Sequence, residues 1–151
     1  MSVGGTWRGR YEYAPGIVGL PADFTLRLRE LRFFRLVGTV QDDPPGMPEE
    51  GQVEGWVVGR WLTFCKRMPR FRVAGDNGSV PIAEWLGAHS QFRIASETPH
   101  PPLRYRGTLN SDGQSASGVW RLGTSFIRLQ GGTHALRLPG CHGTWSVRRV
   151  E

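Results

Sequence analysis

The sequence predicts an all-β protein: a closed antiparallel up-and-down β-barrel of about 8–10 strands, with one short helix or long loop inserted near residues 75–102. Three observations support this fold. Apolar and polar residues alternate with a period of two through most of the chain, which is typical of strands with one buried face. The tripeptide Gly-Thr-Trp occurs near both ends, at residues 5–7 and 143–145. The 21 Gly and 11 Pro are spread along the chain, which suits many short strands joined by turns.

The first expected strand covers residues 5–13, and the last covers residues 143–150. One face of the first strand carries its aromatic and small residues, namely Trp7, Gly9, Tyr11 and Tyr13. Both strands begin with the same tripeptide. Because closure removes the exposed edges of an antiparallel sheet, these matching ends predict that the first and last strands pair.

Two more strands are expected before the strong turn signal Asp-Asp-Pro-Pro-Gly at residues 42–46. Their predicted inward-facing residues are Phe24, Leu26 and Leu28 in the first and Phe34, Leu36, Gly38 and Val40 in the second. Residues 52–58 and 61–67 read as a hairpin that bends at Gly59 and Arg60. Residues 70–74 are expected to form a further short strand.

The region from residue 75 to residue 102 does not follow this alternation. Ser79 is a candidate helix N-cap with Pro81 in the first turn. Helical spacing then relates the residues Ile82, Trp85, Leu86 and His89. The sequence Thr-Pro-His-Pro-Pro at residues 98–102 indicates an extended surface loop. A connection this long inside a compact domain is typical of a functional or mobile element.

Regular strands resume at residues 103–109 and turn at residues 110–113. The next strand places four residues on one face, namely Ala116, Gly118, Trp120 and Leu122. Residues 126–130 and 134–138 form another expected hairpin across Gly131 and Gly132.

Small and aromatic residues recur in these strands in a pattern that resembles the calycin-type barrels, which include the lipocalins, fatty-acid-binding proteins and avidins. The segments that carry the resemblance are Trp7-Arg8-Gly9-Arg10-Tyr11, Gly38-Thr39-Val40-Gln41-Asp42, Gly55, Phe64-Cys65-Lys66, Tyr105-Arg106-Gly107, Gly118-Val119-Trp120 and Gly143-Thr144-Trp145. The resemblance covers nearly the whole chain except residues 75–102. In lipocalins a Gly-x-Trp near the start packs against a late arginine. The resemblance therefore implies that Trp7 packs against Arg148 or Arg149.

Inward-facing aromatic residues indicate either a packed core or the wall of a ligand cavity. Glycines at positions 9, 38, 55, 107 and 118 remove volume from inward positions and favour the cavity. The candidate ligand-binding residues are Tyr11, Tyr13, Phe24, Phe34, Phe64, Lys66 and Tyr105.

Lys66 is the one lysine of the chain, and it faces inward if Leu62 and Phe64 do. Inside a barrel it could pair with a ligand carboxylate, form a Schiff base, or neutralise Asp42 or Asp43. A rim lysine that extends into water is the simpler reading. The opposite register, with Trp61, Thr63 and Cys65 inside, would place Lys66 on the outer surface.

No metal or cofactor is expected. His89, His100, His134 and His142 lack the spacing of zinc ligands. A single strand histidine such as His134 could ligate haem, as in the nitrobindin barrels that also begin Gly-x-Trp, but no second feature supports it. The sequence has no nucleophile elbow, phosphate loop or dinucleotide-binding motif.

The 151 residues are expected to form one domain, residues 1–151. Without an N-terminal hydrophobic signal core or a long apolar run, we expect a cytoplasmic protein that does not enter a membrane. Cys65 and Cys141 are then expected to be reduced thiols, and a disulfide between them is the alternative. The formal net charge of +6 comes from arginines that alternate along apparent strands, a dispersed arrangement that argues against nucleic-acid binding. The sequence does not indicate the oligomeric state.

Three classes of function are consistent with these features. The leading one is a binding protein for a small apolar or aromatic ligand in the barrel interior. The second is a protein-interaction module that uses the 75–102 segment, with Trp85 and Leu86 as exposed candidates. The third is an isomerase or decarboxylase-type enzyme with an acid–base site built from Tyr11, Tyr13, Tyr105, Glu54 and Lys66.

Overall fold

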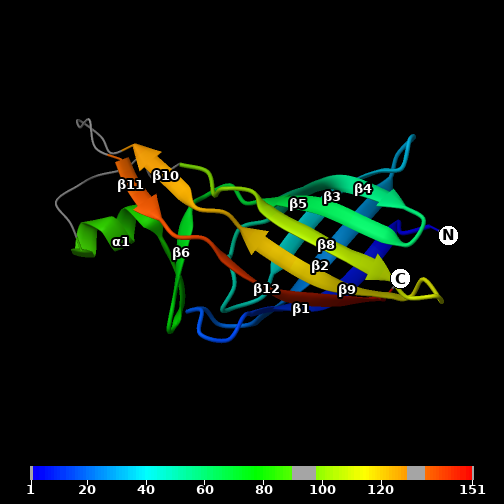
Figure 1. Ribbon diagram of the computed structural model, residues 1–151, viewed down its shortest axis with the longest axis horizontal. Helices are drawn as coiled ribbons and strands as arrows, with labels where there is room; N and C mark the ends of the chain where they lie inside the picture. Colours follow the sequence, from blue (N-terminus) through cyan, green and yellow to red (C-terminus); the bar gives the residue numbers. More distant parts are fainter. Residues whose placement is uncertain (1, 90–97, 129–134, 151) are drawn as a thin grey trace.

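The computed structural model describes residues 2–89, 98–128 and 135–150. Within these residues eight antiparallel strands close into a barrel in the order β1-β12-β9-β8-β5-β4-β3-β2 (Figure 1). The barrel strands are β1 Gly5–Tyr13, β2 Ala22–Glu30, β3 Arg35–Asp42, β4 Gly51–Val58, β5 Trp61–Arg67, β8 Leu103–Leu109, β9 Ser115–Leu122 and β12 Cys141–Arg149. The predicted fold class, an all-β barrel with one short helix, is confirmed.

The barrel closes where its first and last strands meet. Strand β1 pairs with β12 from Trp7 opposite Arg149 to Tyr13 opposite Gly143, and its other edge pairs with β2. Neither strand therefore keeps an open edge. The pairing of the two strands that share the Gly-Thr-Trp sequence is confirmed.

Trp7 fills one end of the barrel, here called the closed end. Its side chain is 2% exposed, and its indole Nε1 donates a hydrogen bond to the carbonyl oxygen of Val3 at 3.0 Å. The guanidinium carbon of Arg149 lies 4.5 Å from the centre of the Trp7 ring, a cation–π contact. Arg149 also donates hydrogen bonds to the backbone carbonyls of Ser2 and Gly4. The predicted cationic partner of Trp7 is therefore Arg149, because Arg148 points to the outer surface.

The opposite, open end carries all of the remaining elements. The two long connections of the chain, residues 68–102 and 123–140, both leave the barrel there. They form what we call the cap: β6 Arg72–Gly75, β7 Gly78–Pro81, α1 Ile82–His89, β10 Ser125–Arg128 and β11 Ala135–Leu138. Figure 1 shows the cap beyond one end of the barrel, with both chain termini near the other end.

A second hydrophobic core holds the cap together. Phe71, Ile82 and Leu86 from the first connection pack with Ile127 from the second. The expected helix is present, but it begins at Ile82, and Ser79 lies in β7, so Ser79 is not its N-cap. The expected hairpin is present as β10 and β11, and its turn lies outside the described residues.

Two predicted orientations are wrong. Phe34 does not face the interior, because it lies in the β2–β3 turn with a left-handed backbone (φ 64°) and is 64% exposed. Left-handed conformations at both Phe33 and Phe34 are typical of a tight hairpin turn, which directs side chains outward. Leu86 is buried in the cap core and is not an exposed candidate for partner binding.

The inward glycines do not create empty space. A Cβ atom on Gly107 would lie 2.2 Å from the carbonyl oxygen of Ser117 and 2.6 Å from Trp145 Cζ2. Gly118 on β9 lies directly opposite Gly107 on β8. On its other side, Gly118 lies opposite Trp145 on β12. These glycines therefore make room for an aromatic ring and for close strand approach, and the interior there is packed.

Candidate ligand-binding cavity

A cavity of about 530 Å³ lies at the open end, between the barrel interior and the cap. The barrel contributes an aromatic and polar wall, and the cap contributes a mainly apolar roof. The lining residues from the barrel strands include Tyr11, Tyr13, Asp42, Lys66, Leu103, Tyr105, Trp120, Leu122 and Cys141. Those from the connections include Phe71, Val73, Trp85, His100, Leu136 and Leu138. None of the five inward glycines lines this space.

The cavity lies at the open end because the two ends of the barrel interior carry different side chains. Towards the closed end, the inward positions carry large apolar side chains that pack against one another, among them Trp7, Leu26, Leu36, Leu62, Leu109 and Val147. At the open end, the last inward positions of the strands carry Tyr13, Asp42 and Lys66, and the cap roof stands beyond them. The described barrel interior is therefore packed towards the closed end, and the cavity lies at the open end.

Lys66 and Asp42 form a buried ion pair in the cavity wall. Lys66 Nζ donates to Asp42 Oδ1 at 2.6 Å, and the two side chains are 3% and 0% exposed. Leu62, Phe64 and Lys66 share the inward face of β5, so the register that places Lys66 inside is the observed one. The interpretation of Lys66 as a rim residue that extends into water is wrong.

Further contacts hold both members of this pair. Tyr11 Oη donates to Asp42 Oδ2 at 3.4 Å, and the backbone N–H of Met47 donates to the same oxygen at 3.3 Å. Lys66 Nζ lies 5.0 Å from the centre of the Tyr11 ring and 5.9 Å from that of Phe24. The carboxylate is thus fixed by three donors, and the ammonium is shielded by aromatic rings.

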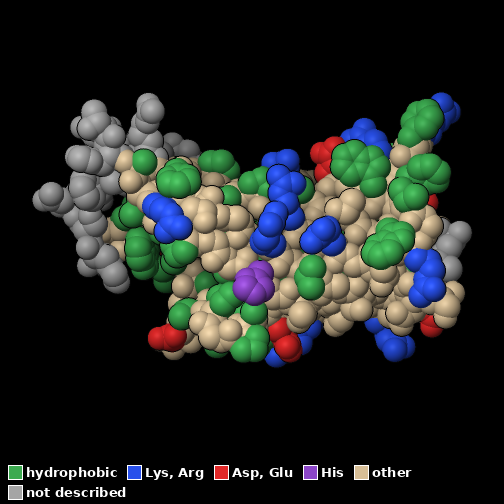
Figure 2. All heavy atoms as spheres, in the orientation of Figure 1, with side chains coloured by type: hydrophobic (Ala, Val, Ile, Leu, Met, Phe, Trp, Pro, Cys, Tyr) green, Lys and Arg blue, Asp and Glu red, His purple; other side chains and the backbone are tan. Residues whose placement is uncertain are grey.

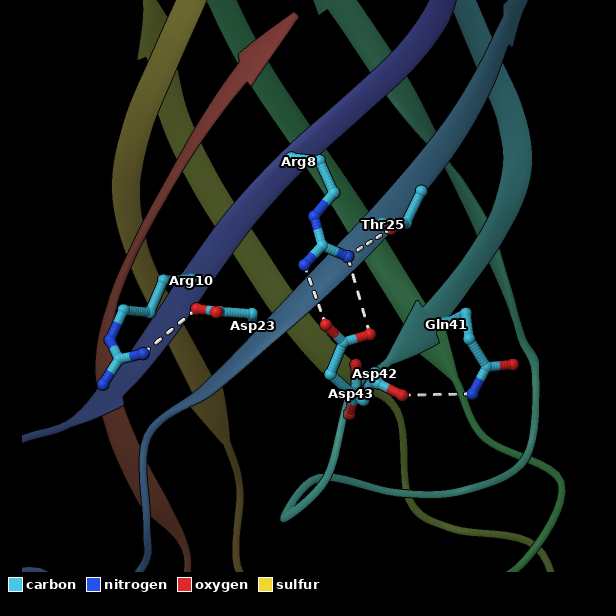
Figure 3. A network of polar contacts seen from close by, with 7 residues as sticks. All are labelled: Arg8, Arg10, Asp23, Thr25, Gln41, Asp42 and Asp43. Carbon is cyan, nitrogen blue, oxygen red and sulfur yellow. Dashed lines mark hydrogen bonds and ion pairs between the residues drawn. The ribbon is translucent and has the colours of Figure 1, made fainter. Parts of the chain in front are cut away.

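Two adjacent acidic residues at the end of β3 point to opposite sides of the barrel wall. Asp42 faces the cavity, whereas Asp43 turns outward and accepts from Arg8 Nη2 at 2.8 Å (Figure 3). This hydrogen bond from Arg8 lowers the pKa of the Asp43 carboxyl. Arg10 pairs with Asp23 at 3.0 Å on the same outer surface. The open-end rim of β1–β3 therefore carries paired charges outside and the Lys66–Asp42 pair inside.

Burial shifts the titration of several groups in the cavity. Desolvation lowers the pKa of Lys66, and the neighbouring Asp42 carboxylate opposes that shift. Burial raises the pKa values of Tyr11 and Tyr105 well above the ordinary value and raises that of Tyr13 to about 12. The tyrosine hydroxyls therefore stay protonated at neutral pH and can donate hydrogen bonds, as Tyr11 does to Asp42. Burial also raises the pKa of the Cys141 thiol to about 11, so this thiol is not a nucleophile at neutral pH.

His100 lies under the cap, although the sequence predicts a surface loop there. It is 6% exposed, its ring contacts that of Phe71 at 5.1 Å between centres, and its Nδ1 lies 2.8 Å from the carbonyl oxygen of Pro101. Burial lowers the pKa of His100 to about 4, so its imidazole is neutral at physiological pH. The loop is extended, but it packs inward because the cap covers it.

The structure brings four of the seven predicted ligand-binding residues together in the cavity, namely Tyr11, Tyr13, Lys66 and Tyr105. Phe24 and Phe64 are buried one layer deeper. The Phe64 ring stacks on that of Tyr105 at 4.9 Å, and Phe24 packs beside Tyr11. Phe34 lies on the outside near the closed end. Phe24 and Phe64 therefore support the cavity wall without lining it.

Sequence reasoning missed several lining residues. Asp42 was named as one of two possible ion-pair partners of Lys66 but not as a ligand-binding residue, although it continues the inward series of Leu36, Gly38 and Val40 at the same period of two. Trp120 was predicted to face inward but was not proposed as a binding residue. The cap residues Leu136 and Leu138 carry no signal of their own, since their place depends on packing against a distant segment.

The residues proposed for an acid–base site do not all come together. Glu54 faces outward on β4 and pairs with Arg35 at 2.7 Å, so it cannot act in the cavity. Among the described residues, no group of three histidine, cysteine or carboxylate side chains is placed to hold a metal ion. His134, the candidate haem ligand, lies outside the described residues.

Comparison with protein-family models, with curated proteins and with solved structures gave no match for this chain. No helix in the described part of the chain has both the length and the apolar character needed to cross a membrane. The function must therefore be argued from the geometry of the cavity.

Proposed function

We propose that this chain is a calycin-like barrel that binds one small, largely apolar or aromatic molecule in the cavity at its open end. The observation that carries the proposal is the cavity of about 530 Å³ between the barrel and the cap. Ligand pockets for small molecules commonly span about 300–1,000 Å³ and combine apolar walls with a few fixed polar groups. The aromatic wall and the Lys66–Asp42 pair match that description.

The charge of the site favours a neutral ligand. Lys66 would suit an acidic ligand if its charge were free, but Asp42 already neutralises it at 2.6 Å. A ligand carboxylate would place a second negative charge beside Asp42 in an apolar space, which is unfavourable. An aromatic body bearing a neutral polar end would instead pack on Tyr105 and Trp120 and hydrogen-bond at the ion pair.

The cap supplies the other side of the binding site. Trp85, Leu136 and Leu138 come from elements that pack on the second core, so the roof is held by its own hydrophobic cluster. The helix α1 buries Ile82 and Leu86 in that cluster. We therefore assign the described parts of the 75–102 segment, residues 75–89 and 98–102, to the ligand-binding site and not to the binding of a partner protein.

A neutral fluorescent probe tests this function. N-phenyl-1-naphthylamine brightens in apolar surroundings, and we expect the wild-type protein to bind it with saturation at one site per chain. Leu122→Trp fills part of the cavity, whereas Val119→Trp adds the same side chain to the outer face of the same strand. We expect Leu122→Trp to weaken binding at least about tenfold, equivalent to about 1.4 kcal/mol, and Val119→Trp to leave it unchanged.

Equal binding by both variants would place the probe elsewhere on the protein. The absence of saturable binding to the folded wild type would refute the proposed function.

A further inference from the structure

The single lysine of this chain occupies an unusual position. Lys66 is the only lysine among 19 lysine and arginine residues, and it lies inside the barrel with its side chain 3% exposed. An arginine could pair with Asp42 through two hydrogen bonds, and arginine serves every other cationic position. An ion pair alone therefore does not require lysine here. A primary amine has one capacity that a guanidinium lacks at neutral pH, which is nucleophilic attack on a carbonyl carbon.

The surroundings of Lys66 contain what that attack requires. The amine must lose a proton, and burial lowers the pKa of Lys66. The Asp42 carboxylate, 2.6 Å from Nζ, is placed to accept the proton. Within the described residues, Asp42 accepts the one hydrogen bond that Lys66 donates, so two N–H positions of the ammonium are free to meet a ligand oxygen. Lys66 is one of the residues that line the cavity, beside Tyr11, Asp42 and Tyr105.

We propose that Lys66 forms a Schiff base with an apolar aldehyde bound in the cavity, with Asp42 as proton carrier and counter-ion. This inference rests on the proposed function, since the aldehyde must first occupy the binding site. It commits the site to a neutral carbonyl compound with an aromatic or apolar body.

The chemistry balances with the groups present. The Lys66 ammonium gives one proton to Asp42, and the nitrogen lone pair attacks the carbonyl carbon. A second proton moves from nitrogen to the former carbonyl oxygen, which gives a neutral carbinolamine. The C–O bond then breaks as Asp42 returns its proton to the hydroxyl, and the oxygen leaves as water. The product iminium keeps the single positive charge of the original ammonium beside the Asp42 carboxylate. The Tyr11 ring, 5.0 Å away, contributes cation–π stabilisation.

Reductive trapping tests the inference, with trans-cinnamaldehyde as the probe. Sodium cyanoborohydride transfers hydride to the iminium carbon and leaves a stable secondary amine, which adds the mass of the aldehyde less one oxygen atom. We expect one adduct, located at Lys66 by peptide mapping, and saturation with rising aldehyde. We expect its rate to exceed that of Lys66 in the urea-unfolded chain at least about tenfold, because the folded site positions the amine and supplies the base.

Two variants separate the roles of the pair. Lys66→Arg keeps a cation beside Asp42 and should give no adduct at position 66. Asp42→Asn removes the proton carrier, and we expect trapping at Lys66 to slow at least about tenfold. If either variant fails to fold, the location and rate of the wild-type adduct still decide the outcome.

Cinnamyl alcohol distinguishes binding from reaction, because it has the same body without a carbonyl. We expect the alcohol to raise the melting temperature of the protein and to compete with trapping. Stabilisation by both compounds without a Lys66 adduct would overturn the Schiff base and leave the proposed function standing. An adduct confined to the N-terminal amine, or one that forms equally fast in the unfolded chain, would also overturn it. Failure of both compounds to bind would remove both proposals.

Discussion

At the scale of single residues, Trp7 is the side chain on which the closed end depends. It is buried, it donates a hydrogen bond to Val3, and it packs under the Arg149 guanidinium. Trp7→Ala would leave a large cavity, and we expect it to lower the free energy of unfolding by about 3–5 kcal/mol in urea titrations. Trp61→Ala is the matched control. Because Trp61 is 71% exposed, its replacement should lower the free energy of unfolding far less. Similar losses for both variants would show that Trp7 does not hold the closed end.

The Lys66–Asp42 pair should behave as a unit. Lys66→Met leaves the Asp42 carboxylate buried without its cation, and we expect a loss of about 3–5 kcal/mol in the free energy of unfolding. The double variant Lys66→Met with Asp42→Asn removes both charges, and we expect it to be more stable than Lys66→Met by roughly 2 kcal/mol. Thermal or urea unfolding of the wild type, both single variants and the double variant measures this coupling. Additive losses would contradict a buried, mutually dependent pair.

His100 predicts how stability depends on pH. Burial lowers its pKa from 6.5 to about 4, so between these values the unfolded chain binds a proton that the folded chain does not. The stabilisation from neutral His100 is therefore complete above about pH 6.5 and is lost as the pH falls towards 4. Between about pH 7 and about pH 4.5, protonation of His100 in the unfolded chain should lower the free energy of unfolding by roughly 2–3 kcal/mol.

His100→Gln should flatten that part of the stability profile, whereas His142→Gln, which changes an exposed histidine, should not. Urea unfolding at a series of pH values gives both curves. Parallel wild-type and His100→Gln profiles would show that His100 titrates normally in the folded protein.

Individual side chains also show where sequence patterns hold and where they fail. The period of two places Trp7 and Tyr11 correctly, because each lies within a strand. For Lys66 it left two registers open, and the inward one is observed. It fails at Phe34, because the strand begins one residue later and a turn sets the direction of that side chain. A boundary error of one residue is enough to move a side chain from one face to the other.

At the scale of elements, strands β8 and β9 place like charges opposite each other. Arg104 pairs directly with Arg121, both are exposed, and neither forms an ion pair with a described acidic residue. On the face shown in Figure 2, basic side chains are spread over the molecule from the cap to the far end of the barrel. Cross-strand repulsion of this kind costs about 0.2–1 kcal/mol.

Arg121→Thr should therefore raise the free energy of unfolding by about that amount, with a smaller gain at high salt. The control is Arg27→Thr, because Arg27 lies between Thr6 and Thr39 on the neighbouring strands. Thermal unfolding at low and high ionic strength measures both variants. Equal changes for the two would mean that strand propensity, and not repulsion, is responsible.

The cap is the element that the sequence predicts least completely. Its helix and one hairpin are visible as local patterns, but their association is not, because residues 68–102 and 123–140 lie on either side of two barrel strands in the chain. The connections meet because the strands that precede them, β5 and β9, both end at the open end of the barrel. Both long connections therefore start there. Only the assembled barrel brings Phe71 and Ile127 into one core.

At the scale of the whole molecule, the barrel was predictable because closure, alternation and turn signals all indicate the same fold. The cavity was expected for a reason that proves wrong. The inward glycines admit Trp145 and close strand contacts, whereas the space at the open end arises because the cap stands over polar and aromatic strand ends. Side-chain volume at single positions cannot show this, since it depends on which segments cover the barrel.

The measurement that tests the account most directly is a two-dimensional ¹H–¹⁵N spectrum of the six tryptophan indoles during titration with N-phenyl-1-naphthylamine. Trp85 and Trp120 line the cavity, whereas Trp7 lies at the closed end and Trp56 and Trp61 lie on the outer surface. We expect the indole signals of Trp85 and Trp120 to shift with saturation while those of Trp7, Trp56 and Trp61 stay in place. Binding of the probe that moves the signals of Trp56 and Trp61, and leaves Trp85 and Trp120 unchanged, would contradict the account.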